Sequence, residues 1–100
     1  MTDAPSLLKD ALKRAEPVTL SLADIGARGL LEALAEDGGS YAVRIESLAA
    51  RVEVEMGSGL VVGARAVRDG RTLEGREAYA LLRGIKTGTA RVAPKRFLSM

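Results

Sequence analysis

A few carboxylates, hydroxyls and glycines in this chain have types and spacings that could support chemistry. Glu53 and Glu55 are paired carboxylates of the kind that serve acid–base or metal chemistry. Ser6 and Lys9 have the Ser-x-x-Lys spacing of penicillin-recognising serine enzymes, and residues 57–63 (GSGLVVG) are rich in glycine, as phosphate loops are. The sequence has no histidine and no cysteine, which removes a histidine base, a cysteine nucleophile and zinc sites built on either residue.

The elements that must position these residues argue against each of those chemistries. Residues 41–46 and 51–56 alternate apolar and polar side chains, which predicts a hairpin in which Glu53 faces Arg44 as a cross-strand ion pair. A strand, not a helix N-terminus, follows the glycine-rich segment, so a turn is favoured over a phosphate loop. The Ser-Asp-Asn signature that accompanies Ser-x-x-Lys is absent. We therefore expect no catalytic residue, no cofactor and no metal site, and the protein is not expected to be an enzyme.

The periodicity of apolar residues predicts an α+β fold, with an antiparallel β-meander of three to five strands packed against two or three helices. Helices are expected over residues 5–15, from Ser21 to Asp37 and from Thr72 to Gly88. Strands are expected over residues 18–22, 41–46, 51–56, 60–67 and 89–93. The organisation expected is an N-terminal amphipathic helix (1–17), one α+β domain (18–94), and a tail or the start of a continuing chain (95–100). Gly26 and Gly29 predict close packing of the second helix against another backbone.

The strand at residues 60–67 is expected to follow a three-residue turn at residues 57–59. Pairing Leu60 with Met56 places Leu60, Val62 and Ala64 on the core side of that strand. The same register places Val61 and Val67 on the solvent side. Residues 68–71 are expected to form a polar loop.

Arginine outnumbers lysine eleven to four in a chain of net charge +2. Four arginines are expected around one loop and helix start: Arg65, Arg68, Arg71 and Arg76. They are the candidate contacts of an alternative function, a small module that binds phosphate or nucleic acid. Acidic residues share this stretch and the chain has only three aromatic side chains for base stacking, which favours a solvated charged loop.

Three short motifs follow one another along the chain. Residues 20–25 (LSLADI) combine spaced leucines with an aspartate at a helix start, and residues 59–64 (GLVVGA) end a hairpin. Residues 75–82 (GREAYALL) open a helix that precedes Gly88. In this order the motifs resemble the bacterial PATAN domain family over residues 18–93, of which the chain would be a divergent member.

The resemblance implies a non-catalytic adaptor that binds another protein in bacterial signal transduction, motility or polarity. A response regulator, a kinase or a motility component is the partner it suggests. The candidate contacts are apolar residues expected outside the core: Leu48, Val61, Val67, Phe97 and Leu98. A homodimer through an unpaired edge strand is a further expectation.

Membrane insertion is not expected from the sequence. No apolar run approaches the ~20 residues that cross a bilayer. Residues 1–6 lack the basic and hydrophobic regions of a signal peptide, so the expected location is the cytoplasm.

Overall fold

The computed structural model describes residues 4–48 and 50–95, which form three helices and a six-stranded antiparallel sheet. The helices are α1 (Ala4–Arg14), α2 (Leu22–Asp37) and α3 (Arg76–Arg83). The strands are β1 (Val18–Ser21), β2 (Tyr41–Glu46), β3 (Arg51–Gly57), β4 (Leu60–Arg68), β5 (Arg71–Glu74) and β6 (Thr89–Pro94). The predicted α+β class is confirmed, and the sheet has one strand more than the expected upper limit of five.

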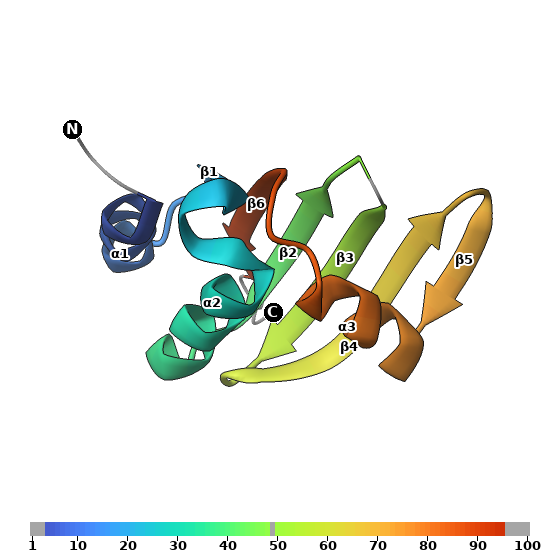
Figure 1. Cartoon of the computed structure of the whole chain (residues 1–100). Helices are drawn as coiled ribbons and strands as arrows, with labels where there is room; N and C mark the ends of the chain where they lie inside the picture. Colours follow the sequence, from blue (N-terminus) through green and yellow to red (C-terminus); the bar gives the residue numbers. More distant parts are fainter. Residues whose placement is uncertain (1–3, 49, 96–100) are drawn as a thin grey trace.

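The strands lie in the order β1-β6-β2-β3-β4-β5, and α2 and α3 cross one face of the sheet (Figure 1). β6 is inserted between β1 and β2, so the last described strand joins the first strand to the meander. α1 lies beside β1 at one end of the sheet and contacts both β1 and α2. In the described residues, the molecule therefore has a face covered by helices and an open face.

The β2–β3 hairpin has the predicted register at every pair. Its core side is formed by six buried side chains: Tyr41, Val43 and Ile45 of β2, and Val52, Val54 and Met56 of β3. A shift of one residue would turn all six toward water, because side chains alternate between the faces of a sheet. The strict alternation of apolar and polar residues therefore determines this register.

The predicted register of β4 against β3 is wrong by two residues. Ala64 pairs with Val54 rather than with Val52, and Ala66 takes the place opposite Val52. Ala66 is buried, and α3 packs against β4. Small side chains of β4 therefore meet the helix layer in this part of the core.

A β-bulge accompanies this shift. The register changes between Glu55 and Met56, so Val62 has no partner on β3 and Val61 pairs with Met56. Met56 is buried beneath the helices, so its partner Val61 lies on the helix side of the sheet. The prediction that Val61 lies on the solvent side is therefore wrong. Leu60 and Val62, both expected in the core, are 69% and 65% exposed.

Two-residue turns join β3 to β4 and β4 to β5. Ser58 and Gly59 both have positive φ, and so do Asp69 and Gly70. Two successive residues with positive φ match the right-handed twist of the flanking strands and form a tight hairpin turn. The three-residue turn predicted at residues 57–59 is therefore wrong by one residue.

The strand that the sequence did not predict is β5. Its residues were expected to form a polar loop and the start of a helix. β5 pairs with residues 65–68 of β4. Thr72 lies within β5 and caps nothing, and α3 begins after Gly75 and ends at Arg83 instead of Gly88. Helical spacing predicts a buried stripe of Ala78, Leu81, Leu82 and Ile85, and all of these except the partly buried Leu81 are buried.

Ser21 and Gly38 cap the two ends of α2. The Ser21 side chain accepts a hydrogen bond from the Ala23 N–H (3.4 Å), and Gly38 ends the helix in the left-handed conformation. Next to this end, the Tyr41 hydroxyl donates a hydrogen bond to Asp37. Burial, that hydrogen bond and the charge of Asp37 together raise the pKa of Tyr41 to about 12.

Gly26 interrupts α2 rather than packing it against a neighbour. Its φ of 74° is not helical, and a Cβ at this position would meet no atom within 4 Å. The kink lets the Ala27 N–H donate to the Ile85 carbonyl oxygen (3.1 Å), which ties α2 to the segment after α3. A Cβ at Gly29 would meet only the side chain of Ile25 in the same helix. The predicted contact of these glycines with another backbone is therefore wrong.

One hydrophobic core connects all three helices to the sheet. Leu8 of α1, Leu30 and Leu34 of α2 and Leu82 of α3 belong to the same buried cluster as the hairpin. No polar or charged side chain is buried in the described part of the chain. Of the helices in residues 4–48 and 50–95, none has both the length and the apolar character that a membrane crossing requires.

Candidate functional site

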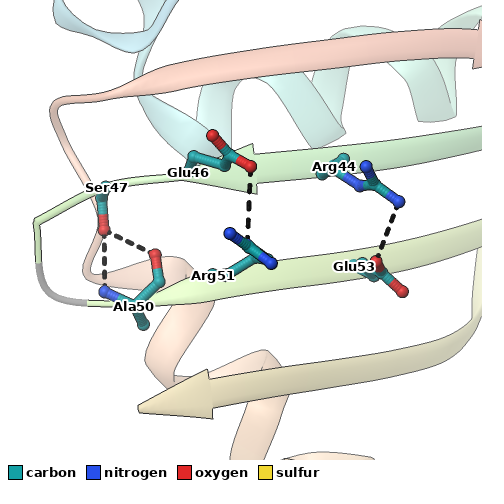
Figure 2. A network of polar contacts seen from close by, with 6 residues as sticks. All are labelled: Arg44, Glu46, Ser47, Ala50, Arg51 and Glu53. Atoms are coloured by element: carbon teal, nitrogen blue, oxygen red, sulfur yellow. Dashed lines mark hydrogen bonds and ion pairs between the residues drawn. The ribbon is translucent and has the colours of Figure 1, made fainter. Parts of the chain in front are cut away.

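The open face of the sheet carries rows of charged side chains. One row crosses the sheet through Arg91 of β6, Arg44 of β2, Glu53 of β3, Arg65 of β4 and Glu74 of β5. Figure 2 shows two rungs of the β2–β3 hairpin, with the helices behind the sheet. Arg44 Nη2 lies 3.3 Å from Glu53 Oε1, and the cross-strand ion pair predicted there is confirmed.

The remaining carboxylates of the hairpin are also paired with cations. Glu46 Oε1 lies 3.5 Å from Arg51 Nε, and Glu55 Oε2 lies 3.1 Å from Lys95 Nζ. Every one of these side chains is at least a third exposed, so solvent screens the pairs and each contributes little to stability. Among the described residues, no group of three acidic side chains is placed as ligands of one metal ion.

A shallow hollow of about 330 Å³ lies on this open face. The small side chains of Ala42 and Ala93 line it together with Arg44 and Arg91. Arg44 is neutralised by Glu53, whereas Arg91 makes no ion pair with any residue in the described ranges. The hollow therefore contains one guanidinium group, that of Arg91, without an ion pair in the described residues.

A larger groove of about 490 Å³ lies on the helix side, between α2 and α3 and over the first residues of β4. We call it the α2–α3 groove. Its apolar lining is Leu31, Ala35, Met56, Leu60, Val61 and Tyr79, and its charged lining is Arg28, Glu32 and Arg83. Arg28 Nε lies 3.2 Å from Glu32 Oε1, which leaves Arg83 as the unpaired charge at this groove within the described residues.

A second hollow continues the groove along β4 toward the start of α3. Val61 and Tyr79 line both depressions, and Val62, Ala64 and Arg76 line only the second. The two depressions therefore form one surface with a continuous apolar lining. Four of the seven exposed large apolar side chains in the described residues lie on it: Leu60, Val61, Val62 and Tyr79.

Backbone contacts hold the two ends of this surface. At the β3–β4 turn, the Gly59 N–H donates to the Gly39 carbonyl oxygen (3.1 Å), and the Ser58 N–H donates to Ser40 Oγ (3.3 Å). A Cβ at Gly59 would come within 2.9 Å of a carbonyl oxygen of α2, so only glycine allows the turn to lie this close to the helix. At the other end, the Gly75 N–H donates to the Ala64 carbonyl oxygen (2.9 Å).

The apolar residues proposed from the sequence as partner contacts lie in separate places. Leu48 projects from the β2–β3 turn and is fully exposed, Val67 is on the open face, and Val61 lines the α2–α3 groove. These three do not form one surface. Phe97 and Leu98 lie outside the described residues.

The four arginines named for phosphate binding are divided between the two faces. Arg65 lies opposite Glu53 and Glu74 in the register of the sheet and shares the open face with them. Arg68 and Arg71 flank the β4–β5 turn as register partners, and their positions alternate to the other face. Arg76 begins α3 and lines the second hollow. The structure therefore does not gather all four into one anion site.

Three contributors to the groove and to the hollow that continues it were missed from the sequence. Leu60 and Val62 were assigned to the core, and Tyr79 was given no role. The available signal was the uninterrupted run of three apolar residues in β4, which no alternating strand can bury entirely. Tyr79 also falls outside the buried stripe of its helix, whose members are Ala78 and Leu82.

Comparisons with protein-family models, with curated proteins and with solved structures found no match to this chain. The similarity to the PATAN family consequently rests on the sequence motifs alone.

Proposed function

We propose that this chain is a non-catalytic adaptor domain that binds another protein through the α2–α3 groove. The motif resemblance suggests a cytoplasmic bacterial signalling, motility or polarity system. A response regulator, a kinase or a motility component would be the partner. The sequence motifs support the class of protein, and the groove supports the mode of action.

The observation that carries the proposal is the contiguity of exposed apolar side chains around the groove. Single exposed apolar residues are common on protein surfaces and need no explanation. A continuous apolar surface in a concave site, bordered by charged residues, is instead typical of interaction sites. Leu60 and Val62 are about two-thirds exposed, although each could have been replaced by a polar residue without loss of core packing.

Positive charge beside the groove favours a partner segment that carries acidic residues. Glu32 neutralises Arg28, while Arg76 and Arg83 make no ion pair with another residue in the described ranges. An apolar segment with nearby carboxylates would bury its apolar side chains against Tyr79 and place its charges near these arginines.

Affinity capture with matched variants tests this proposal. The wild-type chain, Leu60→Asp and Leu48→Asp are immobilised, and proteins retained from a lysate of the source cells are identified by mass spectrometry. Both leucines are exposed, so neither substitution should unfold the chain, and circular dichroism checks this. We expect Leu60→Asp to reduce capture of a signalling or motility protein at least about tenfold, and Leu48→Asp to leave it unchanged.

Two results would overturn the proposal. Equal capture by the wild-type chain and Leu60→Asp would remove the groove from the interaction. Retention that needs nucleic acid, and that is lost between about 50 and 200 mM salt, would instead favour the alternative of phosphate recognition by the arginines.

A further inference from the structure

The outer edge of β4 is paired along only part of its length. β5 pairs with residues 65–68, and the next contact at that edge is the hydrogen bond from Gly75 to Ala64. Within the described chain, no strand pairs with the outer edge of residues 60–63. Outward backbone donors and acceptors of this segment are therefore available to another extended chain.

The other edges of the sheet carry features that discourage such pairing. α1 lies beside β1, and β5 is a four-residue strand with Arg71, Thr72 and Glu74 among its residues. Short length and charged residues are common ways of protecting an edge strand. Residues 60–63 (LVVG) carry no charged or polar side chain, and Leu60 and Val62 are 69% and 65% exposed.

We infer that an extended acidic–apolar segment of the partner protein adds to the sheet as a strand along Leu60–Gly63. This inference rests on the proposed function and specifies how the partner is recognised. The open edge requires an extended backbone, since only successive N–H and C=O groups at strand spacing can pair with it. The position of the edge beside the α2–α3 groove determines which side chains the added strand would carry.

Side chains of the added strand would alternate between the two faces of the sheet. Those on the helix side would enter the surface lined by Val61 and Tyr79, which selects apolar residues. Carboxylates at the ends of the segment would lie near Arg76 and Arg83, which line this surface and make no ion pair with another described residue. The edge thus supplies affinity through the backbone, while the groove and the arginines supply specificity.

Peptides with blocked amides distinguish strand addition from other modes of binding. The probe is a synthetic peptide that alternates valine with threonine and ends in glutamates. It is compared with two versions that carry N-methyl groups on alternate residues, in the two opposite phases. In an antiparallel or a parallel ladder, only every second residue of the peptide directs its N–H group at β4. Only one of the two methylated peptides therefore has its methyl groups on the nitrogens that face β4. We expect that phase of methylation to weaken binding at least about tenfold, and the other phase to change it less than about twofold.

A pair of protein variants locates the site. Val62→Lys places a charge on the open edge, and Val67→Lys places the same charge where β5 already covers β4. Both valines are exposed, so both variants should fold. We expect Val62→Lys to abolish peptide binding and Val67→Lys to retain it. Bound peptide should also slow amide hydrogen exchange within residues 60–63.

Three results would overturn strand addition. The first is equal binding of the two methylated peptides, and the second is protection from exchange confined to residues outside 60–63. The third is the absence of peptide binding. If light scattering then detects a concentration-dependent dimer that Val62→Lys breaks, a second copy of the chain is the occupant of this edge. Any of these results combined with the expected loss of capture by Leu60→Asp would reject strand addition and leave the proposed adaptor function intact.

Discussion

The β2–β3 and β4–β5 hairpins belong to one sheet but use their side chains in opposite ways. In β2–β3, six paired positions bury every large apolar side chain beneath the helices and join charged residues on the open face. In β4–β5, only four positions are paired, and β4 extends beyond β5 with exposed Leu60, Val61 and Val62. The first hairpin buries its large apolar side chains and pairs its charges within the chain, whereas the second leaves apolar side chains and part of a backbone edge exposed.

This difference separates the stabilising part of the sheet from its candidate binding part. Substitutions of the buried side chains of β2–β3 should lower stability, because each of these side chains packs against a cross-strand neighbour. The exposed half of β4 contributes little to the core, so its residues can serve recognition at small cost in stability. Substitutions of the same type in the two hairpins should therefore have very different effects.

The largest difference in stability should come from the same truncation, valine to alanine, made at Val52 and at Val62. Val52 is fully buried, and Val52→Ala should lower the free energy of unfolding by about 2–3 kcal/mol through lost burial and a residual cavity. Val62 is mostly exposed, and Val62→Ala should change the free energy of unfolding by less than about 0.5 kcal/mol. Urea denaturation of both variants measures the difference. Similar values for the two would place Val62 in the core and refute the bulge.

The alternation that predicts one hairpin fails in the other for a physical reason. In β2 and β3, polar residues separate the apolar ones, so a single register buries all of them. Leu60, Val61 and Val62 are consecutive, and no local pattern decides which of them faces the helices. A bulge resolves this conflict in the strand that α3 packs against, and that packing is a tertiary contact which the local sequence does not show.

The candidate site could be predicted only in part for the same reason. The Arg44–Glu53 pair follows from local pairing and was anticipated. The α2–α3 groove needs two helices and a strand end to meet, and the open edge depends on where β5 stops. β5 itself (RTLE) is too short and too polar to be separated from a loop by its sequence pattern.

The two hairpin turns offer a second contrast, between a docked and an exposed glycine. Gly59 and Gly70 both have positive φ at the same position of a two-residue turn. A Cβ would meet a backbone oxygen of α2 at Gly59 and no atom within 4 Å at Gly70. Gly70→Ala should cost about 1 kcal/mol from backbone strain, and Gly59→Ala about 2 kcal/mol or more because the turn must also move. Equal losses in thermal unfolding would show that the β3–β4 turn is not held against α2.

The two tyrosines extend the comparison to pH. Tyr41 of β2 ionises near pH 12 in the folded chain and near its ordinary pKa of 10.0 when unfolded. Between these values the folded state keeps a proton that the unfolded state has lost, so the free energy of unfolding falls as pH rises. We expect a loss of about 1–2 kcal/mol across this window, and Tyr41→Phe should remove that component of the pH dependence.

In the Tyr79→Phe variant, Tyr41 is the only tyrosine. An absorbance titration of this variant therefore measures the ionisation of Tyr41 alone. Denaturation of the same variant between pH 9 and 12 then measures the linked change in stability. Ionisation of Tyr41 near pH 10 in the folded protein would contradict both its burial and its hydrogen bond to Asp37.

The smallest effects should distinguish the charged rungs of the two hairpins. Arg44 and Glu53 form an exposed ion pair, and a double-mutant cycle to alanine should give a coupling of about 0.2–0.5 kcal/mol that decreases in high salt. Arg65 and Glu74 are also register partners, but no ion pair joins them in the described structure. Their coupling should be close to zero. A coupling of Arg65 with Glu74 as large as that of the first pair would mean that the charges of β4–β5 are already satisfied within the chain, and it would restrict the binding role of this hairpin to its apolar edge.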